Sequence, residues 1–200
     1  MYLIYDSYFD RLRKSYFKKV FQNYARPGSK VLDYGSGPGD ALLVAKDLGL
    51  QAVGIDLFTR SIKLAQKRGL QVNLGDYHNL SKYYSPNSFD LIFIQSVVEH
   101  MSSPITELLE IKKYLKKGGH LVISSPTPST YFWDDPTHVR PYTPKSFKIL
   151  AEVLELKLVT VNYVFAYLLN ITLTSRLFYL LINLLPLSLG SNLIGVYQKS

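Results

Sequence analysis

Three aspartates close successive apolar stretches in the first half of the chain, and each could bind a cation or a hydroxyl group. Asp33 lies in VLDY, just before a turn with three glycines in five positions, and Asp56 and Asp76 close the next two stretches. A carboxylate about twenty residues beyond a glycine turn is placed to accept hydrogen bonds from both hydroxyls of a ribose. Each aspartate alone is more simply a turn or helix-capping residue. Three in this order indicate a nucleoside site.

The glycine turn, GSGPG at residues 35–39, allows the backbone to turn sharply and to approach a ligand closely. A turn that binds the pyrophosphate of a dinucleotide has a further glycine or alanine at the position that Asp40 occupies. A carboxylate at that position would repel pyrophosphate, so we expect a ligand without phosphate. Asp33 and Asp40 together favour a ligand that carries a cationic group near the turn.

Short apolar stretches alternate with helix-like stretches from residue 30 to residue 126, which predicts a parallel sheet with helices on both faces. We expect strands at KVLDY, QAVGID, QVNLGD, FDLIFIQ and HLVISS. The continuous apolar run FDLIFIQ is typical of a strand that is buried on both faces. After Pro126 we expect a long ordered loop, a helix at PKSFKILAEVLEL, a strand at KLVTVNYVFAY and a short edge strand at SNLIGVYQKS.

The whole chain, residues 1–200, is expected to form a single domain. Residues 1–26 are predicted to form a helix over one end of the sheet, and residues 165–190 an apolar insertion before the last strand. The absence of cysteine excludes disulfides, thiol nucleophiles and cysteine-bound metals. The net charge of +8 is compatible with a nucleic acid, an anionic membrane or an acidic small molecule. The first residues do not resemble a signal peptide, so we expect a cytoplasmic protein.

Taken in order, these motifs resemble those of the class I S-adenosylmethionine-dependent methyltransferases over residues 30–160. The motifs are VLDYGSGPG, VGIDLFTRSIKLAQKRG, GDYHNL, FDLIFIQSVVEHM and LKKGGHLVISSP. The resemblance implies a doubly wound, Rossmann-like α/β fold, with a seven-stranded, mostly parallel sheet and an antiparallel C-terminal strand. It also implies that the cofactor is S-adenosylmethionine.

The same resemblance implies which residues hold the cofactor. The glycine motif would cradle the methionine part, Asp56 the ribose and Asp76 the adenine amine, with Tyr77 stacking or bonding through its backbone. Gln95 would border the cofactor. The full predicted set is Asp33, Gly35, Gly37, Asp56, Leu57, Asp76, Tyr77 and Gln95.

A general base would assist methyl transfer to a hydroxyl group, and two histidines are candidates. His138 lies in DDPTHVRPYT, and Trp133, Asp134, Asp135, Arg140 and Tyr142 stand near it in the sequence. We select His138 as the catalytic residue; the alternative is a rigid loop whose histidine bonds backbone carbonyls. His100 follows Glu99 after the fourth predicted strand and is more simply a residue that fixes that loop.

We expect no metal. Glu99, His100 and His138 are similar to the metal-binding motif of the small-RNA 2′-O-methyltransferases, but Ser96 stands where that motif has its first glutamate. A site with two histidines and one carboxylate remains chemically feasible.

The stretch 165–190 is apolar, but polar residues interrupt it. No uninterrupted apolar run within it is long enough to span a membrane. It could form a lid or core packing, a homodimer interface, or a contact with a membrane or a lipid-like acceptor. We predict a methyltransferase that acts on a small-molecule or lipid-like acceptor, preferentially at oxygen, and peripheral membrane contact stays one of the three alternatives for this stretch. The alternatives are a nucleic-acid methyltransferase and a non-catalytic cofactor-binding protein.

Overall fold

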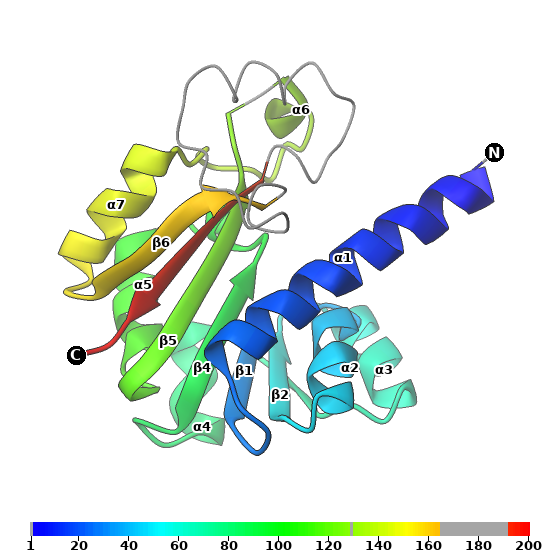
Figure 1. Cartoon of the computed structure of the whole chain (residues 1–200), viewed down its shortest axis with the longest axis horizontal. Coiled ribbons are helices and arrows are strands. Elements are labelled where there is room, and N and C mark those ends of the chain that lie inside the picture. Colours follow the sequence, from blue (N-terminus) through cyan, green and yellow to red (C-terminus); the bar gives the residue numbers. More distant parts are fainter. Residues whose placement is uncertain (1, 129, 165–191) are drawn as a thin grey trace.

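The computed structural model describes residues 2–128, 130–164 and 192–200, and a seven-stranded sheet forms its centre (Figure 1). The strands are β1 (Lys30–Tyr34), β2 (Gln51–Asp56), β3 (Val72–Leu74), β4 (Phe89–Gln95), β5 (Leu115–Pro126), β6 (Lys157–Tyr163) and β7 (Asn192–Gln198). Their order in the sheet is β3-β2-β1-β4-β5-β7-β6. The first five are parallel, and β7 runs antiparallel to both β5 and β6. The predicted Rossmann-like fold is therefore confirmed.

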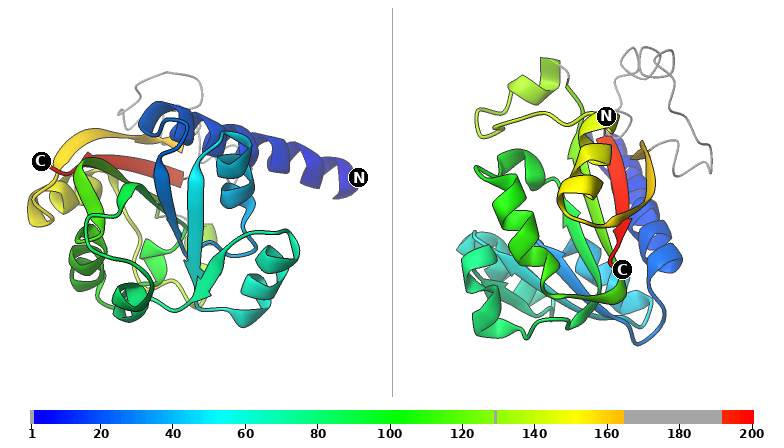
Figure 2. Two further views of the ribbon diagram at one scale, coloured as in Figure 1. Left: turned by 90° about the horizontal axis from the view of Figure 1, so that it is seen from below. Right: turned by 90° about the vertical axis from the view of Figure 1, so that its left-hand side faces the viewer.

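Helices cover both faces of this sheet (Figure 2). The α-helices are α1 (Tyr2–Tyr24), α2 (Asp40–Asp47), α3 (Thr59–Lys67), α4 (Leu80–Tyr83), α5 (Pro104–Lys112), α6 (Thr130–Trp133) and α7 (Pro144–Val153), with 3-10 turns η1 (Tyr77–Asn79) and η2 (Val98–His100). Alternate strand residues face opposite sides, so Leu91 and Phe93 of β4 pack with α1 and α2, whereas Ile92 and Ile94 pack with α5 and α7. This arrangement explains why the β4 sequence is continuously apolar.

The prediction that residues 1–26 form a helix over one end of the sheet is wrong in its placement, because α1 packs on a face of the sheet. Tyr16, Phe17, Val20 and Phe21 are buried in one cluster with residues of β1, β4, β5 and β7. The rings of Phe17 and Phe21 meet the ring of Phe93 edge-on, with centroids 5.7 and 5.5 Å apart. The first turns of α1 extend beyond the sheet (Figure 1).

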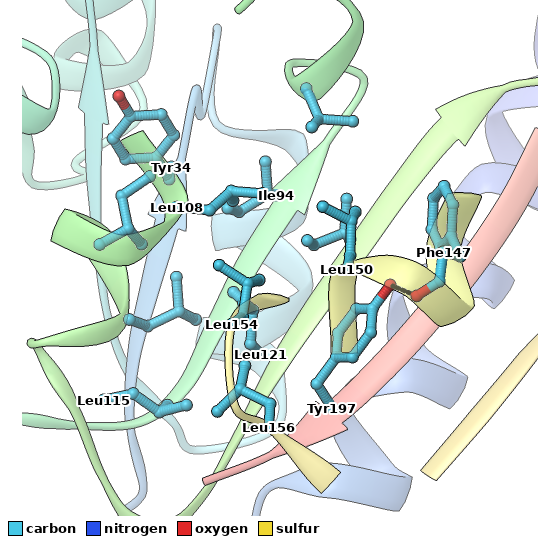
Figure 3. Packing of buried hydrophobic residues seen from close by; sticks show 14 of the residues in the cluster. Tyr34, Ile94, Leu108, Leu115, Leu121, Phe147, Leu150, Leu154, Leu156 and Tyr197 are labelled. Carbon is cyan, nitrogen blue, oxygen red and sulfur yellow. Dashed lines mark hydrogen bonds between the residues drawn. The ribbon is translucent and has the colours of Figure 1, made fainter. Parts of the chain in front are cut away.

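The C-terminal strand β7 is an interior strand, so the prediction of an edge strand is wrong. It pairs with β5 on one side and β6 on the other, and its five central residues are buried. Gly195 lets helix α7 pack closely, because a Cβ atom there would lie 2.3 Å from Cδ1 of Phe147. The Tyr197 hydroxyl donates to the Phe147 carbonyl oxygen at 2.9 Å (Figure 3). The edge strand at this end of the sheet is β6.

Two boundaries near the predicted site also differ from expectation. Strand β3 ends at Leu74, so Asp76 lies beyond the strand that it was expected to close. Strand β5 begins at Leu115, before the predicted HLVISS, and its pairing with β4 shifts register between Phe89 and Leu91.

None of the described helices is both long and apolar enough to cross a membrane. The apolar stretch 165–190 lies outside the described residues, and so do its three alternative roles.

Candidate functional site

Buried polar atoms without partners gather at the carboxyl ends of three neighbouring strands, β1, β4 and β5. Within the described residues, these side-chain oxygens are Ser36 Oγ, Gln95 Oε1, Glu99 Oε2, Ser124 Oγ and Thr127 Oγ1. A buried oxygen without a hydrogen bond is destabilising and rare in native proteins. Ligands of doubly wound sheets bind beyond the carboxyl ends of the strands. These atoms therefore mark the carboxyl ends of these strands as the candidate site.

The glycine turn follows β1 and lies against the segment that follows β4. Gly35 has φ +78°, and a Cβ atom on it would lie 2.3 Å from Cγ2 of Val97. Gly37 has φ +52°, with no atom within 4 Å of its would-be Cβ, so this side of the turn is open. Gly39 packs closely on Leu70, at 2.4 Å from a would-be Cβ, and thus does the helix-packing work that the dinucleotide motif assigns to the next position.

Every backbone N–H group of the turn, residues 35–39, donates a hydrogen bond to an acceptor within the protein. Gly35 and Ser36 donate to the Ile55 carbonyl oxygen at 2.8 and 3.2 Å, and Gly39 donates to that of Ser36 at 3.0 Å. The Gly37 N–H donates to Oδ2 of Asp56 at 2.7 Å. A turn that cradles phosphate needs free N–H groups that point at the ligand. This geometry supports the prediction of a phosphate-free ligand.

The sequence predicted that the carboxylate of Asp40 acts on the ligand at the turn, and this part of the prediction is wrong. Asp40 begins α2, and its carboxylate forms ion pairs with Arg13 of α1 at 2.8 Å and with Arg68 at 2.6 Å. Its charge is thus matched by two guanidinium groups and is not a free anion at the turn. Arg68 also donates to the Pro38 carbonyl oxygen at 3.1 Å, which ties the turn to the end of α3.

Asp33 is the acidic residue whose charge is unmatched. Its side chain is buried, with 2% of the residue exposed. Burial, and then the charges of Asp56 and Asp40, raise the pKa of Asp33 to about 8. A cationic group on a ligand would compensate this charge, so Asp33 suits a positively charged ligand.

Asp56 ends β2 and is held by two backbone groups. Oδ2 accepts from Gly37, and Oδ1 accepts from the Phe58 N–H at 2.8 Å. A carboxylate oxygen has two acceptor sites, so each oxygen keeps one for a ribose hydroxyl. Large apolar side chains are exposed at the ends of β2 and β3, namely Leu57 (60%), Phe58 (73%) and Leu74 (49%). They offer a flat base such as adenine an apolar surface beside the ribose position.

Asp76 caps the 3-10 turn η1, as the simpler interpretation of this residue predicted. Its Oδ1 accepts from the His78 N–H at 2.9 Å, and its own N–H donates to the Asn79 side chain at 3.2 Å. Tyr77 is half-buried, and its ring packs on that of His78 with centroids 3.9 Å apart. Gln95, at the end of β4, donates from Nε2 to Ser96 Oγ at 2.9 Å and leaves its Oε1 unpaired.

His138 lies in the loop between α6 and α7, half-buried against Phe132. Its Nδ1 lies 2.6 Å from the Phe132 carbonyl oxygen. A carbonyl oxygen can only accept, so Nδ1 carries the proton and Nε2 keeps a lone pair in the neutral imidazole. Nε2 lies 3.8 Å from Oδ2 of Asp135, which is too far for a hydrogen bond. The imidazole is thus oriented with one basic nitrogen available.

His100 lies beside His138, with ring centroids 4.7 Å apart. Its Nδ1 lies 3.0 Å from Thr137 Oγ1 and 3.2 Å from the Thr137 carbonyl oxygen. The Thr137 hydroxyl donates to Oδ1 of Asp135 at 2.6 Å, so towards His100 it can only accept. Nδ1 of His100 therefore carries its proton, and Nε2 again keeps the lone pair.

Of the residues predicted to surround His138, only Asp135 approaches its imidazole. Tyr142 belongs to the core instead, where its ring meets that of Phe147 and its hydroxyl donates to the Val98 carbonyl oxygen at 3.4 Å. The remaining residues, Trp133, Asp134 and Arg140, are exposed.

Glu99 is the site residue that sequence reasoning underestimated. Only 1% of it is exposed, and its Oε2 has no partner among the described residues. Burial is the main cause that raises its pKa to about 7, against the lowering effects of its own backbone, Ser125 and His138. Its ligand-forming atom lies within 4.8 Å of those of His100 and His138. The signal in the sequence was a carboxylate inside an apolar run, VVEHM.

One contact joins this cluster to the glycine turn, and a second holds the two segments of the cluster together. Val97, two residues before Glu99, packs on Gly35. The Val139 N–H donates to the Glu99 carbonyl oxygen at 2.8 Å, which fixes the His138 loop to η2. The acidic pair Asp33 and Asp56 and the histidine cluster thus adjoin at one edge of the sheet.

Comparison with known proteins assigns a family. A family model described as "Methyltransferase domain" matches residues 5–161. The chain is 32% identical over 111 residues to a ubiquinone biosynthesis O-methyltransferase from Xanthomonas campestris, covering 53% of this chain and 46% of that protein. The chain therefore spans less than half the length of this curated relative.

Solved structures share the fold. A SAM-dependent methyltransferase from Archaeoglobus fulgidus superposes with a TM-score of 0.74 at 23% identity, over 100% of both chains. Phosphoethanolamine N-methyltransferase 2 from Haemonchus contortus, solved in complex with S-adenosyl-L-methionine, has a TM-score of 0.64 at 18% identity. This match covers 87% of the present chain and 49% of that one.

Proposed function

The chain belongs to the methyltransferase-domain family, and from this premise we propose that it moves a methyl group from S-adenosylmethionine to an oxygen of a small-molecule or lipid-like acceptor. The methyltransferase activity and the cofactor follow from the family. The acceptor class, the methylated atom and the residue roles are the proposal. The observation that carries it is the His138 imidazole, held by the Phe132 carbonyl with its Nε2 lone pair available at the site.

The residues present fit this cofactor. S-adenosylmethionine contributes a methyl group on a positively charged sulfur, which makes the methyl carbon electrophilic. Asp56 would accept hydrogen bonds from the ribose hydroxyls, and Leu57 would pack on the adenine. Asp33, buried and unmatched, would face the cationic amino-acid end. Gly35 and Gly37 would allow that end to approach the backbone, and Asp76, Tyr77 and Gln95 would complete the site.

His138 would serve as the general base. Its Nε2 takes the proton that the acceptor hydroxyl loses as the oxygen is methylated, which converts the imidazole into an imidazolium. The Phe132 carbonyl holds the ring in place through Nδ1, and the carboxylate of Asp135, 3.8 Å from Nε2, stabilises the positive charge. Such a base contributes about 10²- to 10⁴-fold to the rate. Holding the acceptor at attack distance contributes several kcal/mol more.

An apolar acceptor is supported by two exposed apolar side chains that stand near His138 in the sequence. Trp133 and Val139 are 61% and 49% exposed, although both are large and apolar. Exposed apolar groups of this size beside a polar site favour a ligand with an apolar body. One of the similar proteins named above is a ubiquinone biosynthesis O-methyltransferase and the other a phosphoethanolamine N-methyltransferase, and neither name refers to a protein or nucleic-acid acceptor.

The proposal is tested by a transfer assay with methyl-labelled S-adenosylmethionine and matched pairs of acceptors. Each pair holds the same apolar body with a hydroxyl or with an amine, and products are identified by mass spectrometry. We expect label in the ether product and little in the amine product. Label in the amines alone would contradict transfer to oxygen, and label in added RNA alone would replace the small-molecule acceptor with a nucleic acid.

A further inference from the structure

We infer that Glu99, His100 and His138 form a binding site for a divalent transition-metal ion of the zinc class. Each residue offers one ligand atom, and the three atoms lie within 4.8 Å of one another. They come from two segments, η2 after β4 and the loop before α7, which the hydrogen bond from Val139 to Glu99 joins. The inference goes beyond methyl transfer, does not depend on it, and replaces the expectation of no metal that was drawn from the sequence.

Both imidazoles are prepared as ligands before any ion binds. His138 donates its Nδ1 proton to the Phe132 carbonyl, and His100 donates its own to Thr137, which is held by Asp135. Metal-bound histidines nearly always donate the other ring N–H to a carbonyl, a carboxylate or a hydroxyl held in this way. The same bonds leave the Nε2 lone pairs of both rings free to bind an ion.

Glu99 provides the charge that such an ion would match. The residue is 99% buried, and Oε2 has no partner among the described residues. Ser125 and the backbone of Glu99 hydrogen-bond the carboxyl group, but the buried Oε2 without a partner still costs free energy unless a proton or a cation binds there. The carboxylate of Asp135, whose free oxygen lies 3.8 Å from Nε2 of His138, adds a second negative charge nearby.

The chemistry of the cluster calls for a cation between its members. Two imidazole lone pairs and a carboxylate oxygen are three acceptors with no donor among them, so they repel one another unless a proton or a metal ion lies between them. Two nitrogens and one oxygen favour zinc, cobalt or nickel over magnesium or calcium, which prefer oxygen ligands. Three protein ligands leave a fourth position of a tetrahedral ion open to solvent or substrate.

The spacing is wider than a loaded site requires. A tetrahedral ion with bonds of about 2.0–2.1 Å holds its ligand atoms roughly 3.4 Å apart. Separations of up to 4.8 Å must therefore shorten by as much as about 1.4 Å on binding, which rotations of the three side chains would have to supply. The two histidine rings, both partly accessible, leave a route for the ion from solvent.

The ion and a proton compete for the same atom of His138. While Nε2 is bound to a metal, it cannot take the proton of an acceptor hydroxyl. The base role proposed above thus belongs to the metal-free protein, and its tests use chelator-treated samples. Failure of metal binding would leave that role intact, so the two proposals fail separately.

The test titrates chelator-treated full-length protein with Zn²⁺ by calorimetry, and with Co²⁺ by visible absorption, which reports coordination directly. Elemental analysis after gel filtration gives the stoichiometry. We expect one ion per chain, and a loss of affinity of at least tenfold in each of Glu99→Gln, His100→Ala and His138→Ala. Thr137→Val, which removes the hydroxyl beside His100, should weaken binding less. His78→Ala, on the exposed turn η1, is the matched control and should bind as the unchanged protein does.

Cofactor affinity in the same samples shows that each variant is folded. No bound zinc in the unchanged protein at micromolar ion, or equal affinity in Glu99→Gln and the unchanged protein, would overturn the inference. Should His138→Ala fail to fold, the decision rests on the isosteric Glu99→Gln, which keeps the shape of the site and removes only the charge.

Discussion

The Gly37 N–H donates a hydrogen bond of 2.7 Å to Oδ2 of Asp56, and this bond joins the turn after the first strand to the end of the second. It uses the N–H that a phosphate-binding turn would present to its ligand. It also fixes the carboxylate before any ligand arrives, with the Phe58 N–H holding the other oxygen. The Asp56 carboxylate can thus accept hydrogen bonds from hydroxyl groups, whereas the Gly37 N–H cannot donate one to a phosphate.

Replacing Asp56 with alanine should weaken cofactor binding by about a hundredfold or more. The variant loses hydrogen bonds to a charged group, each worth about 1.5–3 kcal/mol, and it frees the Gly37 N–H. Isothermal calorimetry with S-adenosylmethionine measures the change. Asp47→Ala, on the exposed last turn of α2, is the control. Equal affinity in the two variants would remove Asp56 from the cofactor site.

Asp33→Asn should stabilise the cofactor-free protein at high pH. The pKa of Asp33 is about 8 in the folded protein, above its ordinary value near 4, so the folded state favours the neutral form. The unchanged protein therefore loses stability as pH rises from about 4 to 8, and the asparagine variant does not. Thermal unfolding should show a higher Tm for the variant at pH 8.5, by about 2 °C or more, and similar values near pH 4.5.

The same variant should bind S-adenosylmethionine at least tenfold more weakly at pH 8.5, since a neutral amide no longer faces the cation. A variant that is more stable and binds equally well would show that the buried charge serves no ligand. A variant with an unchanged Tm at pH 8.5 would contradict the raised pKa.

Asp40→Ala should have a small effect on both properties, in contrast to Asp33→Asn. Its ion pairs with Arg13 and Arg68 are partly exposed, and such pairs contribute about 1 kcal/mol or less. We expect a fall in Tm of a few degrees and a change in cofactor affinity of less than about threefold. Thermal unfolding and isothermal calorimetry measure the two quantities. A loss of affinity as large as that of Asp56→Ala would return Asp40 to the ligand site.

His138→Gln should slow methyl transfer by about a hundredfold or more in chelator-treated protein, because the base is removed. Cofactor affinity should change little, since His138 lies in the loop before α7 and not at the glycine turn. Single-turnover rates at saturating cofactor separate the two effects, and His120→Gln on β5 is the control. Parallel losses of rate and cofactor affinity would assign His138 a purely structural role.

The sequence was sufficient for the sheet and for the acidic residues at its edge. The alternation of strand and helix, the apolar run FDLIFIQ and the order Asp33, Gly35, Gly37, Asp56 all depend on local pattern, and the structure places them as expected. The sequence could not show that Arg13 and Arg68 neutralise Asp40, because those contacts join residues 27 and 28 positions apart. The position of β7 between β5 and β6 also depends on long-range pairing. The uncharged run LIGVY was nevertheless a sign in the sequence that this strand is an interior one.

The cluster of Glu99, His100 and His138 shows the same limit. The selection of His138 from the sequence rests on the charged and aromatic residues near it in the chain, yet most of them do not contact it in space. Glu99 and Thr137 matter because folding brings η2 against the loop before α7, which no spacing rule predicts. The sequence did show that Glu99 stands within an apolar run. The fold buries this residue and leaves its Oε2 without a partner among the described residues.

The most direct test of the account is a competitive titration of chelator-treated protein with S-adenosylmethionine and with NAD⁺. Both ligands contain an adenosine, but only the dinucleotide carries a pyrophosphate. We predict micromolar binding of S-adenosylmethionine, lost in Asp56→Ala, and no measurable binding of NAD⁺ at millimolar concentration. Binding of NAD⁺ as tightly as S-adenosylmethionine would contradict the claim that the turn, with its N–H groups already donated, admits only a ligand without phosphate.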